Sequence, residues 1–536
     1  MSEILAPGGT PAGAAPQHAP ETLPKTLYEA YDCAALTRPE ALLLVWTEAG
    51  LERISLPDCL DQGRQVAEGL RRLGVGKGHV IATQLPQSLE LIVVEVAAAR
   101  LGAIVLTVVP TFGANELGYI LRESGAKAFV SRTHWRKADV RQRLIDCGDL
   151  PALAAHVICR AEAPAGTIAW SSLLGPTTSD APYAEAAPDD VSFLLYTSGT
   201  TADPKGVQHT HRSLLAEIRS TEALLGPHAQ GVAMSPWPTG HIAGALTNLR
   251  FLALGRTTIC MEHWEASACA DLLQLLGATY GSGTPYHLTG LLDAADAAGH
   301  SLATLKAFQT GAAPVPPSLV ARCAARGLAT FRAYGSTEHP TSTFGSPDDP
   351  LEKRLTTEGR VVPGVELRFL DDDGQDMAAG EDGEIVTRGP DMFAGYTKAE
   401  LNEAALLPGH WCRSGDVGHL DAEGYLVLTD RKKDIIIRGG ENISSREVED
   451  HLHAHPAVAE AAAVAAPDAR MGEIVCAVVV TRPGQDIDIA EVDRWFGARG
   501  LARHKTPERL ELIDALPRNA TGKVLKHELR RRLRGL

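Results

Sequence analysis

The 536-residue sequence has no pair of cysteines at a spacing that predicts a metal site or a disulfide framework. Its nine cysteines are scattered singly, without a Cys-x-x-Cys, which is typical of small core residues in a reducing cytoplasm. The sequence also lacks an excess of basic residues, because its formal net charge is −15. We therefore expect neither nucleic acid nor an anionic lipid surface as a partner.

No hydrophobic run is both long and uncharged enough to predict a membrane span. The most apolar stretch, residues 89–110, is interrupted by Glu90, Glu95 and Arg100 and predicts an amphipathic helix that leads into a buried strand. Residues 1–24 lack the basic and apolar regions of a signal peptide and are rich in Ala, Pro and Gly. This composition predicts a mobile N-terminal tail.

The rest of the chain divides at a basic joint. Up to residue 430, helical patterns alternate with short apolar runs, which predicts an α/β fold with mostly parallel sheets. We expect a large N-terminal domain of several subdomains over residues 25–430, a joint at 431–433 and a small α+β domain over 434–536. The expected strands lie within residues 79–85, 103–109, 127–131, 192–197 and 257–261.

One helix start in the small domain is marked clearly. Ser444 and Glu447 have the spacing of a capping box, and Ile443 and Val448 have that of a hydrophobic staple. The pattern predicts a helix that begins at residue 445, with Gly439 in a tight turn before it.

The stretch LLYTSGTTADPKGVQHTH, residues 194–211, is the first candidate binding site. It follows an expected buried strand, and its hydroxyls, its glycine and Lys205 suit a cradle for phosphate oxygens. It is not a P-loop, because Lys205 is followed by Gly206. Taken alone, it is more typical of a polar surface loop than of a phosphate site.

Five further motifs follow in order along the chain. They are TGAAP (310–314), AYGSTEHPT (333–341), SGDVGHLDAEGYL (414–426), DRKKDIIIRGGENISSREVE (430–449) and PRNATGK (517–523). With the first stretch, they resemble the adenylate-forming superfamily of acyl-CoA synthetases, aryl-CoA ligases, luciferases and nonribosomal peptide adenylation domains. The resemblance covers residue 25 to the C-terminus. This sequence differs from the family pattern at Ala202, where the family usually has Gly, and at Ser336, where the family often has Met.

The resemblance implies two half-reactions. A small carboxylic acid attacks the α-phosphorus of ATP to give an acyl-adenylate and pyrophosphate, and a thiol, CoA, then displaces AMP. It also implies Mg²⁺, with Glu338 as its ligand. The residues implied to bind ATP or AMP are Thr197, Ser198, Gly199, Thr200, Thr201, Lys205, Gly311, Ala312, Ala313, Tyr334, Gly335, Thr337, Asp416 and Arg431. Among them, Tyr334 is expected to stack on adenine and Asp416 to bind the ribose hydroxyls.

Three positions are implied to be catalytic: Lys523, Lys433 and His241. Lys523 is expected to neutralise charge on the attacking carboxylate and the α-phosphate. Lys433 is expected to be the hinge about which the small domain swings between the half-reactions. After that swing, Arg438, Gly439 and Gly440 are expected to line a channel for the pantetheine arm of CoA.

The acyl pocket is implied to be formed by Trp237, Gly240, His241, Gly335, Thr341 and Ser342. Gly240 is expected to leave volume for a wide acyl group, and these residues carry no fixed charge. Together they predict a medium-chain, alicyclic or aryl-substituted hydrophobic acid.

Other functions stay open at this point. A stand-alone enzyme that loads a carrier protein shares the first half-reaction, although residues 235–246 contain no acidic residue to pair with an amino acid's ammonium group. A catalytically silent nucleotide-binding protein and an oxygenase of the luciferase type are the remaining alternatives. The sequence predicts no particular oligomeric state.

Overall fold

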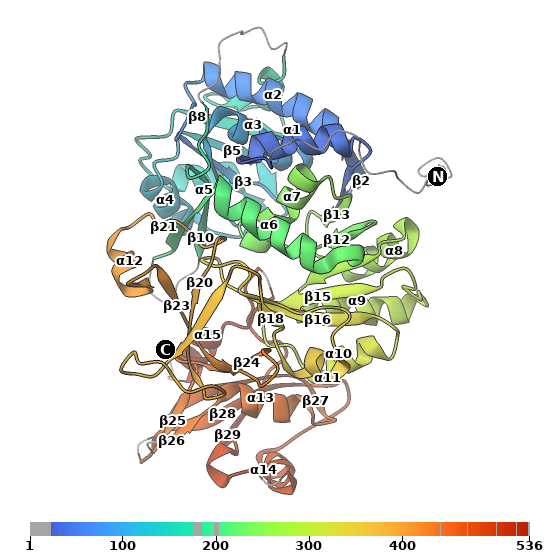
Figure 1. Cartoon of the computed structure of the whole chain (residues 1–536), viewed down its shortest axis with the longest axis vertical. Helices are drawn as coiled ribbons and strands as arrows, with labels where there is room; N and C mark the ends of the chain where they lie inside the picture. Colours follow the sequence, from blue (N-terminus) through green and yellow to red (C-terminus); the bar gives the residue numbers. More distant parts are fainter. Residues whose placement is uncertain are drawn as a thin grey trace.

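The computed structural model describes residues 23–175, 185–197, 203–439, 441–468, 470–499, 501–520 and 522–533. Within these residues, two large sheets form most of the N-terminal part (Figure 1). Most neighbouring strands in both sheets are parallel, and the antiparallel pairs lie toward the sheet edges, which matches the predicted α/β class.

The first sheet has nine strands in the described chain, in the order β18-β17-β16-β15-β14-β12-β13-β1-β2. Their bounds are Leu42–Thr47 (β1), Gly50–Ser55 (β2), Ala233–Ser235 (β12), Thr258–Met261 (β13), Tyr280–Gly283 (β14), Ala307–Gly311 (β15), Ala329–Tyr334 (β16), Thr343–Phe344 (β17) and Arg360–Val361 (β18).

The second sheet has eight strands among the described residues, in the order β21-β11-β10-β4-β3-β5-β8-β9. Their bounds are Val80–Gln84 (β3), Ile104–Thr107 (β4), Ala128–Arg132 (β5), Ala155–Cys159 (β8), Ile168–Ala169 (β9), Val191–Thr197 (β10), Lys205–Thr210 (β11) and Gly395–Tyr396 (β21). The five strands expected from the sequence are β3, β4, β5, β10 and β13.

Helices α2 (Leu56–Arg72), α3 (Leu89–Leu101) and α7 (Ile242–Leu254) share one hydrophobic core with strands of both sheets. The prediction that α3 is amphipathic is wrong, because residues 91–99 are all buried. Glu95 lies inside this core, where Asn248 Nδ2 donates to its Oε1 at 2.9 Å. Burial raises the pKa of Glu95 to about 8.

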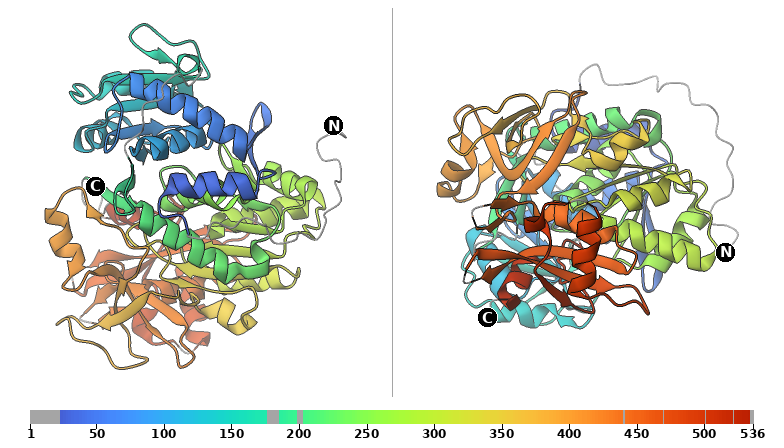
Figure 2. Two further views of the ribbon diagram at one scale, coloured as in Figure 1. Left: turned by 45° about the horizontal axis from the view of Figure 1, so that its top comes forward. Right: turned by 90° about the horizontal axis from the view of Figure 1, so that it is seen from below.

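A third sheet leads toward the C-terminal part. It contains Glu366–Leu370 (β19), Gly383–Arg388 (β20), Leu406–Leu407 (β22), Trp411–Leu420 (β23) and Leu426–Arg431 (β24). The fourth sheet contains Ile436–Arg438 (β25), Glu441–Ile443 (β26), Val458–Asp468 (β27), Gly472–Thr481 (β28) and Arg509–Leu512 (β29). Figures 1 and 2 show the elements of this fourth sheet together at one end of the molecule, with α14 (Ile489–Ala498).

Helix α13 (Ser445–His453) begins at the residue predicted from the sequence. Ser444 Oγ accepts a hydrogen bond from the Glu447 amide at 3.2 Å, and Ile443 and Val448 are buried in one cluster. The capping box is only half formed, since both carboxylate oxygens of Glu447 accept from Lys505 Nζ at 2.8 Å.

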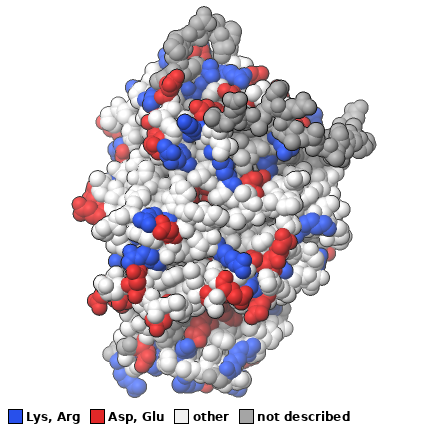
Figure 3. Space-filling view, viewed as in Figure 1, with Lys and Arg blue, Asp and Glu red and all other residues white. Residues whose placement is uncertain are grey.

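The helix lengths, the surface charge and the cysteines complete the description. No helix in the part of the chain that the structure describes has the length and apolar character needed to cross a bilayer. On the face in Figure 3, acidic and basic side chains are interspersed. Each of the nine cysteines is a free thiol, and eight of them are buried.

Candidate active site

The hairpin of β10 and β11 carries the first candidate phosphate ligand. Thr197 and Lys205 are paired across this hairpin. Lys205 Nζ lies 5.4 Å from the ring centroid of Tyr396, whose hydroxyl donates to Glu338 Oε1 at 2.7 Å. The cation and the carboxylate therefore flank one tyrosine. The other predicted residues of the loop lie outside the described residues: Ser198, Gly199, Thr200 and Thr201.

Glu338 stands on a tight turn that follows β16. The Ser336 amide donates to the His339 carbonyl at 2.8 Å, and Ser336 Oγ accepts from the amides of Glu338 and His339, both at 3.1 Å. A Cβ on Gly335 would lie 2.0 Å from the Pro340 carbonyl oxygen, so only glycine fits there. The serine that departs from the family pattern thus closes the turn that presents Glu338.

His209 also supports this turn, and the sequence analysis did not predict this role. Its Nε2 lies 2.7 Å from the Thr337 carbonyl oxygen and its Nδ1 lies 3.2 Å from Ser213 Oγ. A carbonyl only accepts, so Nε2 carries the proton. Burial lowers the pKa of His209, which keeps the ring neutral. The available signal was the pair of histidines that ends residues 194–211.

The predicted ribose ligand lies between two partners. Asp416 is paired with Arg431 across β23 and β24, and Arg431 Nε and Nη2 both contact its carboxylate. Tyr334 donates its hydroxyl proton to Asp416 Oδ2 at 3.0 Å, and its ring is buried. The carboxylate is therefore held in place by a fixed cation and a fixed hydroxyl.

The segment predicted to pass the adenine ring lies beside Tyr334. Gly311 ends β15 opposite Ala333 of β16, and a Cβ on it would lie 2.6 Å from the Ala333 carbonyl oxygen. Ala312 follows in the left-handed region with φ 62°. Such a conformation costs about 1–3 kcal/mol for a residue other than glycine. Ala313 continues the same loop at the carboxyl ends of these parallel strands, where open α/β sheets bind ligands.

Lys523 reaches this site from the C-terminal domain. Burial, followed by the charge of Arg431, lowers the pKa of the Lys523 ammonium to about 8, and Asp416 opposes that shift. Lys433 and Asp434 act on the same ammonium. In this conformation the Lys523 ammonium therefore interacts electrostatically with the predicted ribose ligands.

The joint at Lys433 is a turn. The Asp434 amide donates to the Arg431 carbonyl at 2.8 Å, and Lys432 is paired with Asp372 Oδ1 at 3.0 Å. Proline is disfavoured at the third position of such a turn. Replacing Lys433 by proline would therefore disturb Arg431 as well as a hinge, and the hinge remains a prediction.

Two contacts beyond this joint hold the C-terminal domain in place. Arg446 Nη2 lies 3.0 Å from Glu358 Oε1, and Asp430 Oδ2 accepts from the Ser445 amide at 2.9 Å. These contacts tie the start of α13 to the N-terminal part.

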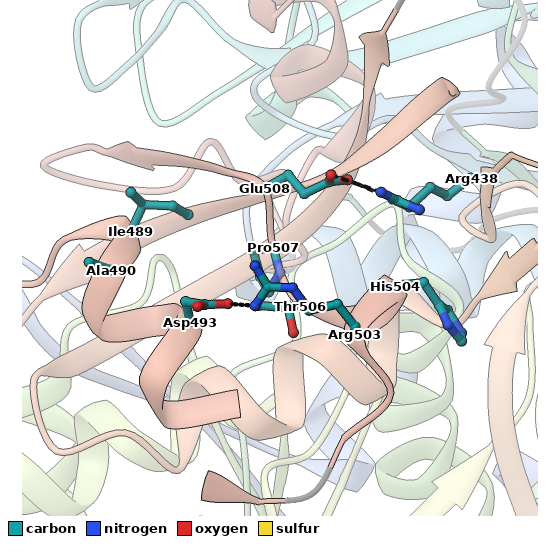
Figure 4. A pocket seen from close by; sticks show the side chains of 9 residues that line it. All are labelled: Arg438, Ile489, Ala490, Asp493, Arg503, His504, Thr506, Pro507 and Glu508. Carbon is teal, nitrogen blue, oxygen red and sulfur yellow. Dashed lines mark hydrogen bonds and ion pairs between the residues drawn. The ribbon is translucent and has the colours of Figure 1, made fainter. Parts of the chain in front are cut away.

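The predicted CoA channel residues lie in the C-terminal domain. Arg438 pairs with Glu508 at 2.6 and 2.9 Å and lines a cavity of about 610 Å³ (Figure 4). Gly439 has φ 58°, and a Cβ on it would lie 2.5 Å from Met471 Cε. Gly440 lies outside the described residues.

Trp237 and His241 form a stacked pair at the predicted acyl pocket. Their ring centroids are 5.5 Å apart, and Trp237 Nε1 donates to Ser282 Oγ at 3.2 Å. Burial, followed by the charge of Lys523, lowers the pKa of His241 to about 4, so His241 is neutral at pH 7. His241 and the C-terminal lysine therefore interact electrostatically.

The other predicted wall residues, Thr341 and Ser342, are buried. Thr341 Oγ1 donates to Glu217 Oε1 at 2.9 Å.

The expectation that Gly240 leaves volume for a wide acyl group is wrong. Gly240 has φ 82°, which disfavours any other residue, and a Cβ on it would lie 2.7 Å from the Val109 amide nitrogen. The glycine is required because the backbone turns and approaches Val109, not because the site needs space. Gly240→Phe would strain the backbone and cannot report on acyl size.

Comparison with known proteins places this site in a family. The model of the AMP-binding enzyme matches residues 32–397, and that of the AMP-binding enzyme C-terminal domain matches residues 447–523. The chain belongs to the AMP-binding enzyme family. The predicted resemblance and the predicted fold class are both confirmed.

Individual relatives agree with this assignment. The chain is 35% identical to the medium-chain fatty-acid–CoA ligase of Escherichia coli (strain K12), covering 85% of this chain and 82% of that one. It is 31% identical to a feruloyl-CoA synthase of Amycolatopsis sp, covering 87% and 91%. The solved structure of a Mycobacterium tuberculosis fatty acyl CoA synthetase has a TM-score of 0.72 at 28% identity, covering 95% and 98%.

The chain is an AMP-forming acid–thiol ligase that acts on a small carboxylic acid with ATP, CoA and Mg²⁺. The described residues fit the metal, since Glu338 is an oxygen donor held on a rigid turn beside Lys205. Bound there, Mg²⁺ would neutralise charge on the phosphate oxygens.

Proposed function

We propose that this enzyme converts a hydrophobic carboxylic acid, medium-chain, alicyclic or aryl-substituted, into its CoA thioester in the cytoplasm. The observation that carries the proposal is the electrostatic interaction of the Lys523 ammonium with Asp416, Arg431 and His241. It joins the predicted catalytic lysine to the nucleotide ligands and to the wall of the acyl pocket. Nine unpaired cysteines favour a reducing compartment.

In the first half-reaction, a carboxylate oxygen forms a bond to the α-phosphorus of ATP, and the bond to the bridging oxygen breaks to release pyrophosphate. Two anions must approach, and at 4 Å unit charges repel by about 4 kcal/mol at an effective dielectric of 20. The Lys523 ammonium offsets this repulsion in the transition state. Asp416 and Arg431 hold the ribose and thereby orient the α-phosphate.

In the second half-reaction, the CoA sulfur forms a bond to the acyl carbon and the carbon–oxygen bond to AMP breaks. The thiol proton passes to solvent, and the electron pair of the broken bond stays on the phosphate oxygen, so AMP leaves with one more negative charge than the adenylate carried. We assign Lys523 no role in this step, because the proposed turn of the C-terminal domain carries it away from the site. We propose that the C-terminal domain turns about Lys433 between the steps and brings Arg438 and Gly439 to the acyl carbon.

The preference for a hydrophobic acid is supported by the charge of the pocket wall. Trp237, Thr341 and Ser342 are uncharged, and His241 is neutral above pH 4. Such a wall suits a neutral acyl body and disfavours a second carboxylate or an ammonium group. The E. coli and Amycolatopsis relatives are named for a medium-chain fatty acid and for feruloyl-CoA, and both acyl groups belong to this class.

A panel of acids tests the substrate class. We expect kcat/KM for CoA-thioester formation with hexanoate, cyclohexanecarboxylate or cinnamate to exceed that with acetate at least 30-fold, because each buried methylene contributes about 0.8 kcal/mol. Malonate and alanine should be poorer still. Equal rates with acetate and hexanoate would contradict the hydrophobic pocket. A holo carrier protein in place of CoA tests the alternative acceptor.

The pKa of Lys523 makes adenylation pH-dependent. The ammonium form is the active one, and the pKa is lowered to about 8, so kcat/KM for pyrophosphate release should fall about ten-fold per pH unit above pH 8. Lys523→Arg should remove this fall in kcat/KM above pH 8, since a guanidinium stays charged. Pyrophosphate release by the wild-type enzyme that stays constant to pH 9.5 would contradict the assignment.

A further inference from the structure

The loop that carries Lys523 is a compact unit. The Lys523 amide donates to Asn519 Oδ1 at 2.9 Å, and the Asn519 amide donates to the Lys523 carbonyl at 3.0 Å. Arg518 Nη1 donates to the Gly522 carbonyl, and Arg518 pairs in a β-bridge with Val524. The position of the Lys523 ammonium therefore depends on where this loop, described over residues 518–520 and 522–524, comes to rest.

The loop rests on Tyr286, in the first turn of α9 (Pro285–Ala298) of the N-terminal domain. A Cβ on Gly522 would lie 3.1 Å from both Cβ and Cδ1 of Tyr286, so the glycine backbone is in contact with the ring. Arg518 Cζ lies 5.6 Å from the ring centroid of Tyr286, within the range of a cation–π interaction. Tyr286 is nonetheless 44% exposed, so it is not a core residue.

The turn beneath Tyr286 is rigid. Thr284 caps α9 in a capping box with His287, and Pro285 occupies the first turn. The His287 ring lies 5.6 Å from the Tyr286 centroid and 6.1 Å from that of Trp237. The contact surface for the loop is thus fixed to the wall of the predicted acyl pocket.

We propose that Tyr286 is the docking residue that positions Lys523 for adenylation. The contact joins the two domains directly at the catalytic loop, whereas Arg446–Glu358 joins them near the joint. It exists in the conformation in which Lys523 interacts electrostatically with Asp416. The inference rests on the proposed role of Lys523, and it makes Tyr286 a positioning residue for the first half-reaction only.

Two variants separate docking from structure. Tyr286→Phe keeps the ring that touches Gly522 and Arg518, and Tyr286→Ala removes it. We expect Tyr286→Ala to lower kcat for acid-dependent pyrophosphate release about ten-fold, which corresponds to about 1.4 kcal/mol of transition-state stabilisation lost with the ring contacts to Gly522 and Arg518. Tyr286→Phe should retain the wild-type rate. Both variants should convert a supplied hexanoyl-adenylate and CoA to thioester at the wild-type rate.

The remaining measurements distinguish docking of the Lys523 loop from a change in how the acyl pocket binds the acid. The KM for hexanoate should be unchanged in Tyr286→Ala, and a rise in that KM with kcat unchanged would overturn docking. In a Lys523→Ala background, Tyr286→Ala should cause no further loss of pyrophosphate release. A second ten-fold loss there, or equal losses in both half-reactions, would also overturn it. Wild-type enzyme that released no pyrophosphate would instead refute the proposed function.

Discussion

Replacing Lys523 by alanine is expected to lower kcat for pyrophosphate release by about 10²–10³-fold, the loss typical of removing one preorganised electrostatic contact. The Lys523 ammonium interacts electrostatically with Asp416, Arg431 and His241, which line the proposed place of attack on the α-phosphate. Conversion of supplied hexanoyl-adenylate and CoA to thioester should keep most of its wild-type rate. The two half-reactions are measured separately, by pyrophosphate release and by thioester formation.

A second lysine of the same domain serves as the control. Lys505 is paired with Glu447 outside the site, so Lys505→Ala removes a charge without touching the nucleotide ligands. It should leave both half-reactions near their wild-type rates. A fall of both half-reactions to the same extent in Lys523→Ala would refute its assignment to adenylation.

Glu338→Gln is expected to lower pyrophosphate release about 10²-fold at ordinary Mg²⁺ concentrations, because an amide is a far weaker ligand than a carboxylate for a hard cation. The amide oxygen can still accept from the Tyr396 hydroxyl, so the turn should survive. The measurement is pyrophosphate release against Mg²⁺ concentration, and the half-maximal concentration should rise at least ten-fold.

Tyr396→Phe is the matched control for this variant. It removes the hydroxyl that contacts Glu338 and leaves the carboxylate, so its effect should be much smaller. If the Mg²⁺ dependence of Glu338→Gln equalled that of the wild type, another group would have to hold the metal.

The sequence predicts best those features whose causes lie within one short segment. The cap at Ser444 and the five expected strands depend on neighbouring residues, and they form as expected. The order of the motifs correctly indicates the family. Asp416 and Arg431 also meet as expected, because their segments form adjacent strands.

Other features depend on contacts that no local pattern encodes. His209 donates a hydrogen bond to the carbonyl of Thr337, which lies 128 residues further along the chain. Tyr286 contacts a loop that begins at Arg518. Gly240 illustrates a second limit. A glycine can be needed because it leaves room for a ligand, because the backbone has a positive φ, or because another segment packs close to it. At Gly240 the φ of 82° and the nearness of Val109 show that the second and third reasons apply.

The most direct test of the account follows oxygen atoms through the reaction. The enzyme is supplied with hexanoate labelled with ¹⁸O at both carboxylate positions, ATP, Mg²⁺ and CoA, and the products are analysed by mass spectrometry. If a carboxylate oxygen attacks the α-phosphorus, each AMP carries one ¹⁸O, the hexanoyl-CoA keeps the other, and pyrophosphate is unlabelled. Formation of ADP, or ¹⁸O in orthophosphate or pyrophosphate in place of AMP, would contradict an acyl-adenylate route.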